Sequence, residues 1–391
     1  MASEQQLTSA TQGISCHAWN ADRSMVAISP NNNEIHIYET KTWTRLYLLS
    51  EHDLMVSALD WSAVSNKIVS CSHDRNAFVW TFQPETNSWK PALVILRIDR
   101  AAIDVRWSSD GARFAVTSGA KCVPVCTYES ANDWWVCKMV KKKFKSTVLC
   151  CAFHPTNGQL LATGCADFKM RIFSTFASDV DGTNVDAGPF SNSLGPQSFG
   201  EIYLELSALG WIHAVAWSPS GNIIAYTGHD SSVHFADLTT CQANAEPVVH
   251  TVRLPQLPLC SLLFLSERAL CGAGHDFNPV IFTANAGGWS FYCNVDKEEG
   301  NSKSNSPVPA AGGISAAREL FRNKTARGQD LKVDTDTLRT VHERAITLIQ
   351  DATLPGQKSG CISRISTSSL DGRLVVWDLP ALDIDMASLT M

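Results

Sequence analysis

A sevenfold internal repetition constrains the fold of this chain more than any other feature. Each repeat has an apolar strand, a polar turn, a second strand with small residues, an acidic turn and a third strand ending in an aromatic residue. The first strand ends in an aromatic residue in six of the repeats, at Trp19, Trp61, Trp107, Phe153, Trp217 and Phe264. The steps between these positions are 42, 46, 46, 64 and 47 residues, so one unit recurs and one interval carries an insertion.

This period predicts an all-β fold, a seven-bladed WD40 β-propeller that occupies residues 1–391 as a single domain. The seventh repeat has no aromatic residue in its first strand but ends in a Trp-Asp pair, Trp377-Asp378. Because a closed ring needs a seam between the two chain ends, we expect the segment before Ile14 to supply the outer strand of the last blade.

Two repeats carry a full set of polar residues at the spacing of a WD40 blade. The second repeat has His52, Ser70, Asp74 and Trp80. The seventh has His342, Thr367, Asp371 and Trp377. A buried carboxylate is costly unless a donor such as an imidazole N–H meets it, so these four groups are expected to form a hydrogen-bond chain within the blade. The fourth and sixth repeats keep only an Asp and a Phe of the set.

The same residue types could make a catalytic triad, but a triad is one convergent site and does not recur at blade spacing. The sequence has no GxSxG, HExxH, P-loop or dinucleotide motif, so we expect a protein that is not an enzyme and has no cofactor. The segment GHD occurs at 228–230 and at 274–276, each time in the same turn and without a Cys/His cluster. We interpret both as turn chemistry, and no metal site is expected.

The amino-acid composition limits the classes of partner and the cellular compartment that we expect for this protein. A formal net charge of −6 and a pI near 6.0 argue against a nucleic-acid or anionic-membrane binder. The 13 cysteines lie in apolar runs without any CxxC pair, as expected of reduced, buried thiols. The N-terminus lacks a signal-peptide pattern, and apolar stretches such as ALVIL at 92–96 are too short to span a bilayer. We therefore expect a cytoplasmic protein with no membrane insertion.

Two departures from the repeat are candidate functional segments. A basic run leads into the fourth repeat and consists of Lys141, Lys142, Lys143 and Lys145, alternating with Val140 and Phe144. This pattern suits a segment that faces an acidic protein partner. The alternative is that the lysines form a solvated edge of the domain. The stretch 176–210, rich in Gly, Pro, Asn and Asp, is predicted to be a long inter-blade loop laid on the surface.

A third departure, at 296–341, is predicted to be a protruding insertion with a short amphipathic helix at about 314–324. Ile314, Ala317, Leu320 and Phe321 share one side of this helix, flanked by Arg318 and Arg322. About ten residues cannot hold an isolated helix, so it should form only when its apolar face docks, either on its own propeller or in the groove of a partner. The polar run KEEGNSKSNSPVPAA before it favours the partner.

Several segments that are not propeller consensus make the chain resemble the WD-repeat subunit, subunit 1, of the actin-related protein 2/3 complex. They include NDWWVCK at 132–138, DFKMRIFS at 167–174, GWIHAVAWS at 210–218, GHDSSVHFADL at 228–238 and the helix ARELFRN at 317–323. The resemblance covers essentially the whole chain.

The resemblance implies a non-catalytic scaffold beside actin-related proteins and smaller accessory subunits, in a complex that nucleates branched actin filaments in the cytoplasmic actin cytoskeleton. It further implies contact with the mother actin filament, which the family associates with the insertion, and with acidic segments of nucleation-promoting factors. From the residues alone, a generic WD40 adaptor binding a peptide partner in its central channel is the alternative; it predicts charged or aromatic residues converging on one face.

Overall fold

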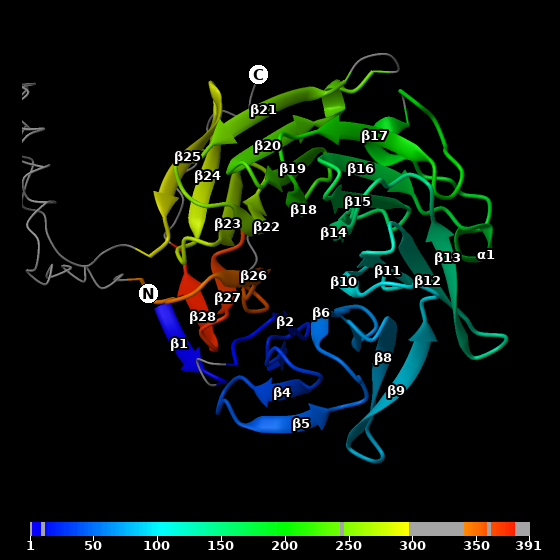
Figure 1. Ribbon diagram of the computed structural model, residues 1–391, viewed down its shortest axis with the longest axis vertical. Coiled ribbons are helices and arrows are strands. Elements are labelled where there is room, and N and C mark those ends of the chain that lie inside the picture. Colours follow the sequence, from blue (N-terminus) through cyan, green and yellow to red (C-terminus); the bar gives the residue numbers. More distant parts are fainter. Residues whose placement is uncertain are drawn as a thin grey trace, which may run out of the picture.

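The computed structural model describes residues 2–8, 12–191, 193–242, 246–296, 340–357 and 361–379. These residues form seven four-stranded antiparallel sheets arranged as the blades of a closed ring (Figure 1). The predicted seven-bladed β-propeller is thus confirmed. The predicted insertion helix, with Ile314, Ala317, Arg318, Leu320, Phe321 and Arg322, lies outside the described residues.

Each blade is built outwards from an inner strand that lines the central channel. The inner strands are β2 (Cys16–Trp19), β6 (Val56–Trp61), β10 (Ala102–Trp107), β14 (Val148–Phe153), β18 (Ile212–Trp217), β22 (Leu259–Ser266) and β26 (Ile346–Asp351). The second strands are β3 (Met25–Ser29), β7 (Lys67–Ser72), β11 (Arg113–Ser118), β15 (Leu160–Cys165), β19 (Ile223–Gly228), β23 (Ala269–Gly274) and β27 (Arg364–Ser369).

The third strands are β4 (Ile35–Glu39), β8 (Asn76–Gln83), β12 (Val123–Glu129), β16 (Lys169–Ser174), β20 (Ser232–Asp237), β24 (Val280–Asn285) and β28 (Arg373–Asp378). The outer strands are β5 (Arg45–Leu49), β9 (Ser88–Ile95), β13 (Trp134–Val140), β17 (Ile202–Ser207), β21 (Val248–Arg253), β25 (Gly288–Asn294) and, for the seventh blade, β1 (Ala2–Gln6).

The N-terminal strand closes the ring. β1 pairs antiparallel with β28, from Ala2 opposite Trp377 to Gln6 opposite Arg373, and the two strands lie side by side at the blue and red ends of the ribbon (Figure 1). Arg373 Nε adds an ion pair at 2.8 Å to Glu4 Oε1. The expected seam, with the segment before Ile14 completing the last blade, is confirmed.

The core lies between blades and not at the centre of the ring. Seven apolar clusters each combine buried side chains from two neighbouring blades. The aromatic residues that end the inner strands, among them Trp61 and Trp107, are buried in these clusters. Because each blade buries its faces only against its neighbours, the repeat spacing sets the core as well as the strands.

The prediction of a loop over 176–210 is wrong for its last third, because β17 forms the outer strand of the fourth blade there. Its sequence IYLELS alternates as a strand should, but the Gly- and Pro-rich residues before it hide the pattern. The rest of the segment holds α1 (Ser178–Asp181) and a 3-10 turn, η1 (Gly188–Phe190). Phe190 is fully buried and stacks on Tyr203 at 5.0 Å, so the segment is fixed to the ring. A second 3-10 turn, η2 (Leu238–Thr240), follows β20.

Candidate interaction face

The connections between strands lie on two opposite faces of the ring, and the strand direction decides which connection lies on which face. Because the four strands of a blade alternate in direction, the turn between the second and third strands lies at the same end as the connection to the next blade. We call the face formed by these turns and connections the insertion face, because residues 297–339 join β25 to β26 there. Asp296 Oδ2 accepts a hydrogen bond of 2.7 Å from the backbone N–H of Val341, so the two ends of the insertion are tied together.

The basic run forms part of the insertion face as a loop, residues 141–147, between β13 and β14. Lys141, Lys142 and Lys145 are exposed, and Lys143 Nζ lies 3.1 Å from Glu201 Oε2. Phe144 does not face solvent but is buried between the third and fourth blades. The loop is therefore anchored at its centre and presents cationic side chains on either side of the anchor.

The four polar residues of the second blade form a continuous hydrogen-bond chain beneath this face. His52 Nδ1 lies 2.8 Å from Asp74 Oδ2, and His52 Nε2 lies 2.9 Å from Ser70 Oγ. Trp80 Nε1 donates to the same Ser70 oxygen at 2.9 Å. Burial acts to raise the pKa of Asp74, but the hydrogen bonds from His52 and from backbone N–H groups outweigh it and hold that pKa below its usual value.

The seventh blade repeats this chain. His342 bridges Asp371 Oδ2 at 3.1 Å and Thr367 Oγ1 at 2.7 Å, and Trp377 Nε1 donates to Thr367 Oγ1 at 2.8 Å. As in the second blade, burial alone would raise the pKa of Asp371, and the hydrogen bond from His342 lowers it on balance. In both blades the Asp also accepts from the backbone of the preceding inter-blade connection, which fixes the loops of the insertion face.

The fourth blade replaces the histidine with an arginine that the sequence reasoning missed. Phe144 occupies the position of His52, and Arg171 Nη2 lies 2.9 Å from Asp167 Oδ2 with its guanidinium 5.6 Å above the Phe144 ring. Asp167 also accepts at 3.0 Å from the backbone N–H of Lys145, which holds the lysine loop. An Asp with no preceding histidine and an Arg four residues later is the signal that could have revealed this pair.

Apolar side chains lie next to the lysine loop around the ring. Phe168, Leu209 and Trp211 are 45%, 69% and 49% exposed, and we call them the apolar rim. Phe168 follows Asp167 directly, and its carbonyl accepts at 2.8 Å from Ala208 in the connection to the fifth blade. Cationic and apolar side chains thus follow one another on one part of the insertion face. Nothing in the repeat pattern distinguishes this rim from ordinary turn residues.

The two GHD segments lie in equivalent turns. His229 Nδ1 lies 2.8 Å from His213 Nε2, and His275 Nε2 lies 3.3 Å from Cys260 Sγ. Burial and the neighbouring imidazoles lower the pKa of His213 to about 4. Within the described ranges, no three His, Cys, Asp or Glu side chains are grouped so that they could hold a metal ion.

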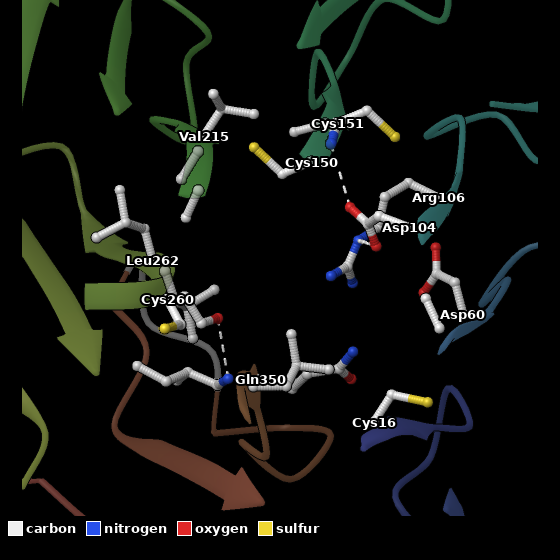
Figure 2. Close-up of a pocket in the computed structure, with 18 of the residues that line it drawn as sticks. Cys16, Asp60, Asp104, Arg106, Cys150, Cys151, Val215, Cys260, Leu262 and Gln350 are labelled. Atoms are coloured by element: carbon white, nitrogen blue, oxygen red, sulfur yellow. Dashed lines mark hydrogen bonds and ion pairs between the residues drawn. The ribbon is translucent and has the colours of Figure 1, made fainter. Parts of the chain in front are cut away.

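A central channel of about 640 Å³ runs between the inner strands. Figure 2 shows Asp60, Asp104 and Arg106 together on one side and Val215 and Leu262 on the other. In six blades the inner strand has an irregular register near its start, which turns side chains such as His213 and Cys260 towards this channel.

The charged residues of the channel connect neighbouring blades. Asp60 accepts at 2.8 Å from the backbone N–H of Trp107, and Asp104 accepts at 3.1 Å from that of Cys151. Burial opposes the charge on Arg106, yet Asp104 and Asp60 hold its pKa above its ordinary value. Asp60 and Asp104 are thus engaged in contacts that connect the second, third and fourth blades.

Seven four-stranded blades around a channel, with the His–Ser/Thr–Asp–Trp chain in two of them, define a WD-repeat β-propeller. Residues 43–81, 136–174 and 204–237 match the family described as WD domain, G-beta repeat. No helix in the described part of the chain is both long and apolar enough to cross a membrane.

Curated relatives resemble the chain over nearly its whole length. It is 41% identical over 384 residues to actin-related protein 2/3 complex subunit 1B of Arabidopsis thaliana, covering 96% of this chain and 97% of the relative. It is 40% identical to subunit 1A-B of Xenopus laevis, covering 95% of each chain, and 38% identical to subunit 1 of Schizosaccharomyces pombe, covering 93% and 96%. The chain belongs to the actin-related protein 2/3 complex subunit 1 family, which confirms the resemblance drawn from the sequence.

Proposed function

We propose that this chain is a non-catalytic scaffold subunit of an actin-related protein 2/3 complex in the cytoplasm, where it supports the nucleation of branched actin filaments. The observation that carries the proposal is the identity of 38–41% with relatives of that name over nearly the full length of both chains. The partners that follow are actin-related proteins, the smaller accessory subunits, the actin filament and acidic segments of nucleation-promoting factors.

The buried polar chains support a structural role for the residues that could be taken for a triad. Ser70 Oγ lies between His52 Nε2 and Trp80 Nε1, and Ser70 is fully buried. A nucleophile must be able to reach its substrate, and this hydroxyl is enclosed within the blade. Thr367 has the same position and the same burial in the seventh blade.

The lysine loop and the apolar rim suit an acidic segment with apolar anchors. Lys141, Lys142 and Lys145 supply exposed positive charge in a chain whose net charge is −6, and the apolar rim begins beside Asp167, which holds Lys145. Cationic side chains steer an acidic partner to the face, and apolar contacts slow its release. We assign this surface to the acidic segments of nucleation-promoting factors.

The insertion at 297–339 is the proposed contact with the mother actin filament, through Ile314, Ala317, Leu320 and Phe321 with Arg318 and Arg322 at the flank. Its ends are tied together by Asp296 and Val341, so the segment leaves and returns at one point of the insertion face. Docking of this segment on its own propeller is the competing outcome.

The first experiment tests assembly. Affinity-tagged full-length chain purified from its own cells should bring down both actin-related proteins and the accessory subunits in constant ratio. Recovery of the chain only as a free monomer would refute the proposal.

A second experiment separates the two surfaces within the assembled complex. Lys141→Glu with Lys142→Glu should weaken binding of an acidic activating peptide about tenfold, at about 1 kcal/mol or less for each reversed charge. The matched control, Lys41→Glu with Lys90→Glu, makes the same change of charge at exposed positions away from the insertion face and should leave peptide binding intact.

The insertion is tested separately. Leu320→Asp with Phe321→Asp should leave assembly and peptide binding unchanged and reduce branch formation on preformed actin filaments. Failed assembly or lowered propeller stability would show instead that the segment packs on its own ring.

A further inference from the structure

Two cysteines face each other across the outer edge of the third blade. Cys126 in β12 is directly opposite Cys137 in β13, and their Sγ atoms are 2.7 Å apart. Directly opposed residues of antiparallel strands have Cα atoms about 4.5–5.5 Å apart, within the range that a disulfide spans. Of the 13 cysteines, all within the described residues, no other two are opposed in a strand pair.

The two thiols differ in their surroundings. Cys126 is fully buried in the cluster between the second and third blades, and burial raises its pKa. Cys137 is partly exposed on the edge strand. The hydrogen bond from Cys126 lowers its pKa, burial opposes this effect, and the nearby charge of Arg97 adds to the lowering. A partly exposed thiol next to a cation and a donor is the environment of a reactive cysteine.

We infer that Cys126 and Cys137 form a reversible oxidation site, in which a peroxide converts the pair to a cross-strand disulfide that covalently links β13 to β12. The Cys137 thiolate attacks one peroxide oxygen, the O–O bond breaks, and the departing hydroxide takes up a proton to leave as water. The product is a sulfenic acid on Cys137. Cys126 sulfur then attacks the Cys137 sulfur, the S–O bond breaks, and hydroxide leaves with the Cys126 proton as a second water. Two thiols and one peroxide thus give one disulfide and two waters.

The other thiol neighbours do not share this geometry. Cys150 and Cys151 are adjacent in β14 and point to opposite sides of the strand, with Cys150 Sγ directed to Ile212 O and Cys151 Sγ to Ala115 O. Cys122 lies four residues before Cys126 along the same extended chain, too far for a bond to it.

Trypsin isolates the pair in a single peptide, residues 122–138, with Cys122 as an internal reference. The protein is treated with hydrogen peroxide, alkylated with iodoacetamide under denaturing conditions and digested with trypsin, and the mass of this peptide is measured by mass spectrometry. We expect this peptide to lose two hydrogens and to carry one alkyl group, on Cys122, in place of three. Treatment with dithiothreitol before alkylation should restore all three alkyl groups.

Three variants make the test specific. Cys122→Ser should still form the disulfide, whereas Cys126→Ser should stop at a Cys137 sulfenic acid that dimedone traps. Cys137→Ser should leave Cys126 reduced at the same peroxide dose. The inference would be overturned by three alkyl groups on the wild-type peptide at the peroxide dose that gives the trapped sulfenic acid in Cys126→Ser, or by a disulfide that includes Cys122. The wild-type mass decides the question even if a variant folds poorly.

Discussion

Replacing Thr367 with Val tests whether the buried polar chain of the seventh blade stabilises the ring. The substitution removes one hydroxyl with little change of shape. It takes away the acceptor of the Trp377 indole N–H, 2.8 Å away, and the partner of His342 Nε2, 2.7 Å away. Both side chains are buried, so water cannot replace the lost oxygen.

The magnitude follows from the number of groups left unpaired. An unsatisfied buried polar group costs about 1–3 kcal/mol, so two such groups should lower the free energy of unfolding by about 2–6 kcal/mol. The exposed Thr86, whose hydroxyl contacts only the exposed Ser88, is the matched control, and Thr86→Val should change stability by less than about 0.5 kcal/mol.

The assay is guanidinium denaturation followed by tryptophan fluorescence, with hydrogen exchange of β26, β27 and β28 as the local readout. A double-mutant cycle adds Trp377→Phe, which removes the orphaned indole donor. The double variant should be less destabilised than the sum of the single variants by about 1–2 kcal/mol. If Thr367→Val behaves like Thr86→Val, or if the cycle shows no coupling, the chain does not stabilise the blade and our reasoning is wrong.

Three further perturbations test other parts of the ring. Arg171→Leu leaves the buried Asp167 carboxylate without its main partner and should cost about 3–5 kcal/mol in denaturation, whereas Arg171→Leu with Asp167→Asn should recover part of that loss. His17 is buried between Ser366 and Ser368, and burial lowers its pKa to about 3 from 6.5. The unfolded chain therefore binds the proton first, and the free energy of unfolding should fall by about 2 kcal/mol as the pH drops from 6.5 to 5. Denaturation at each pH should show a shallower pH dependence for His17→Gln. Deleting residues 1–7 exposes the edge of β28, and light scattering should detect self-association that the intact chain does not show.

The third blade illustrates how far local pattern reaches. The sequence predicts its strands from alternation and spacing, and it marks the basic run that follows β13. It does not predict that Phe144 is buried while its lysine neighbours are exposed, because burial depends on the adjacent fourth blade. It also does not pair Cys126 with Cys137, because a shift of one residue in strand register would separate the two sulfurs.

The fourth blade shows the same limit for polar groups. The sequence shows that the His–Ser/Thr–Asp–Trp set is incomplete in this blade, but it does not show which residue replaces the histidine as the partner of the Asp. Arg171 reaches Asp167 from the next strand and stacks on Phe144, an arrangement that needs the folded blade. The outer strand β17 was missed for a related reason, since its partner β16 lies before a long loop of turn-forming residues.

The sequence by itself determined the number of blades, the two complete polar chains, the N-terminal closure of the ring and the family. The blades, the polar chains and the family segments repeat at fixed spacing or lie in contiguous motifs, and the closure follows because a ring needs a seam between its chain ends. Only the tertiary structure decided which side chains meet between blades, which lysines are exposed and which thiols are opposed. Those outcomes depend on strand register and on the packing of one blade against the next, and neither is encoded in any single repeat.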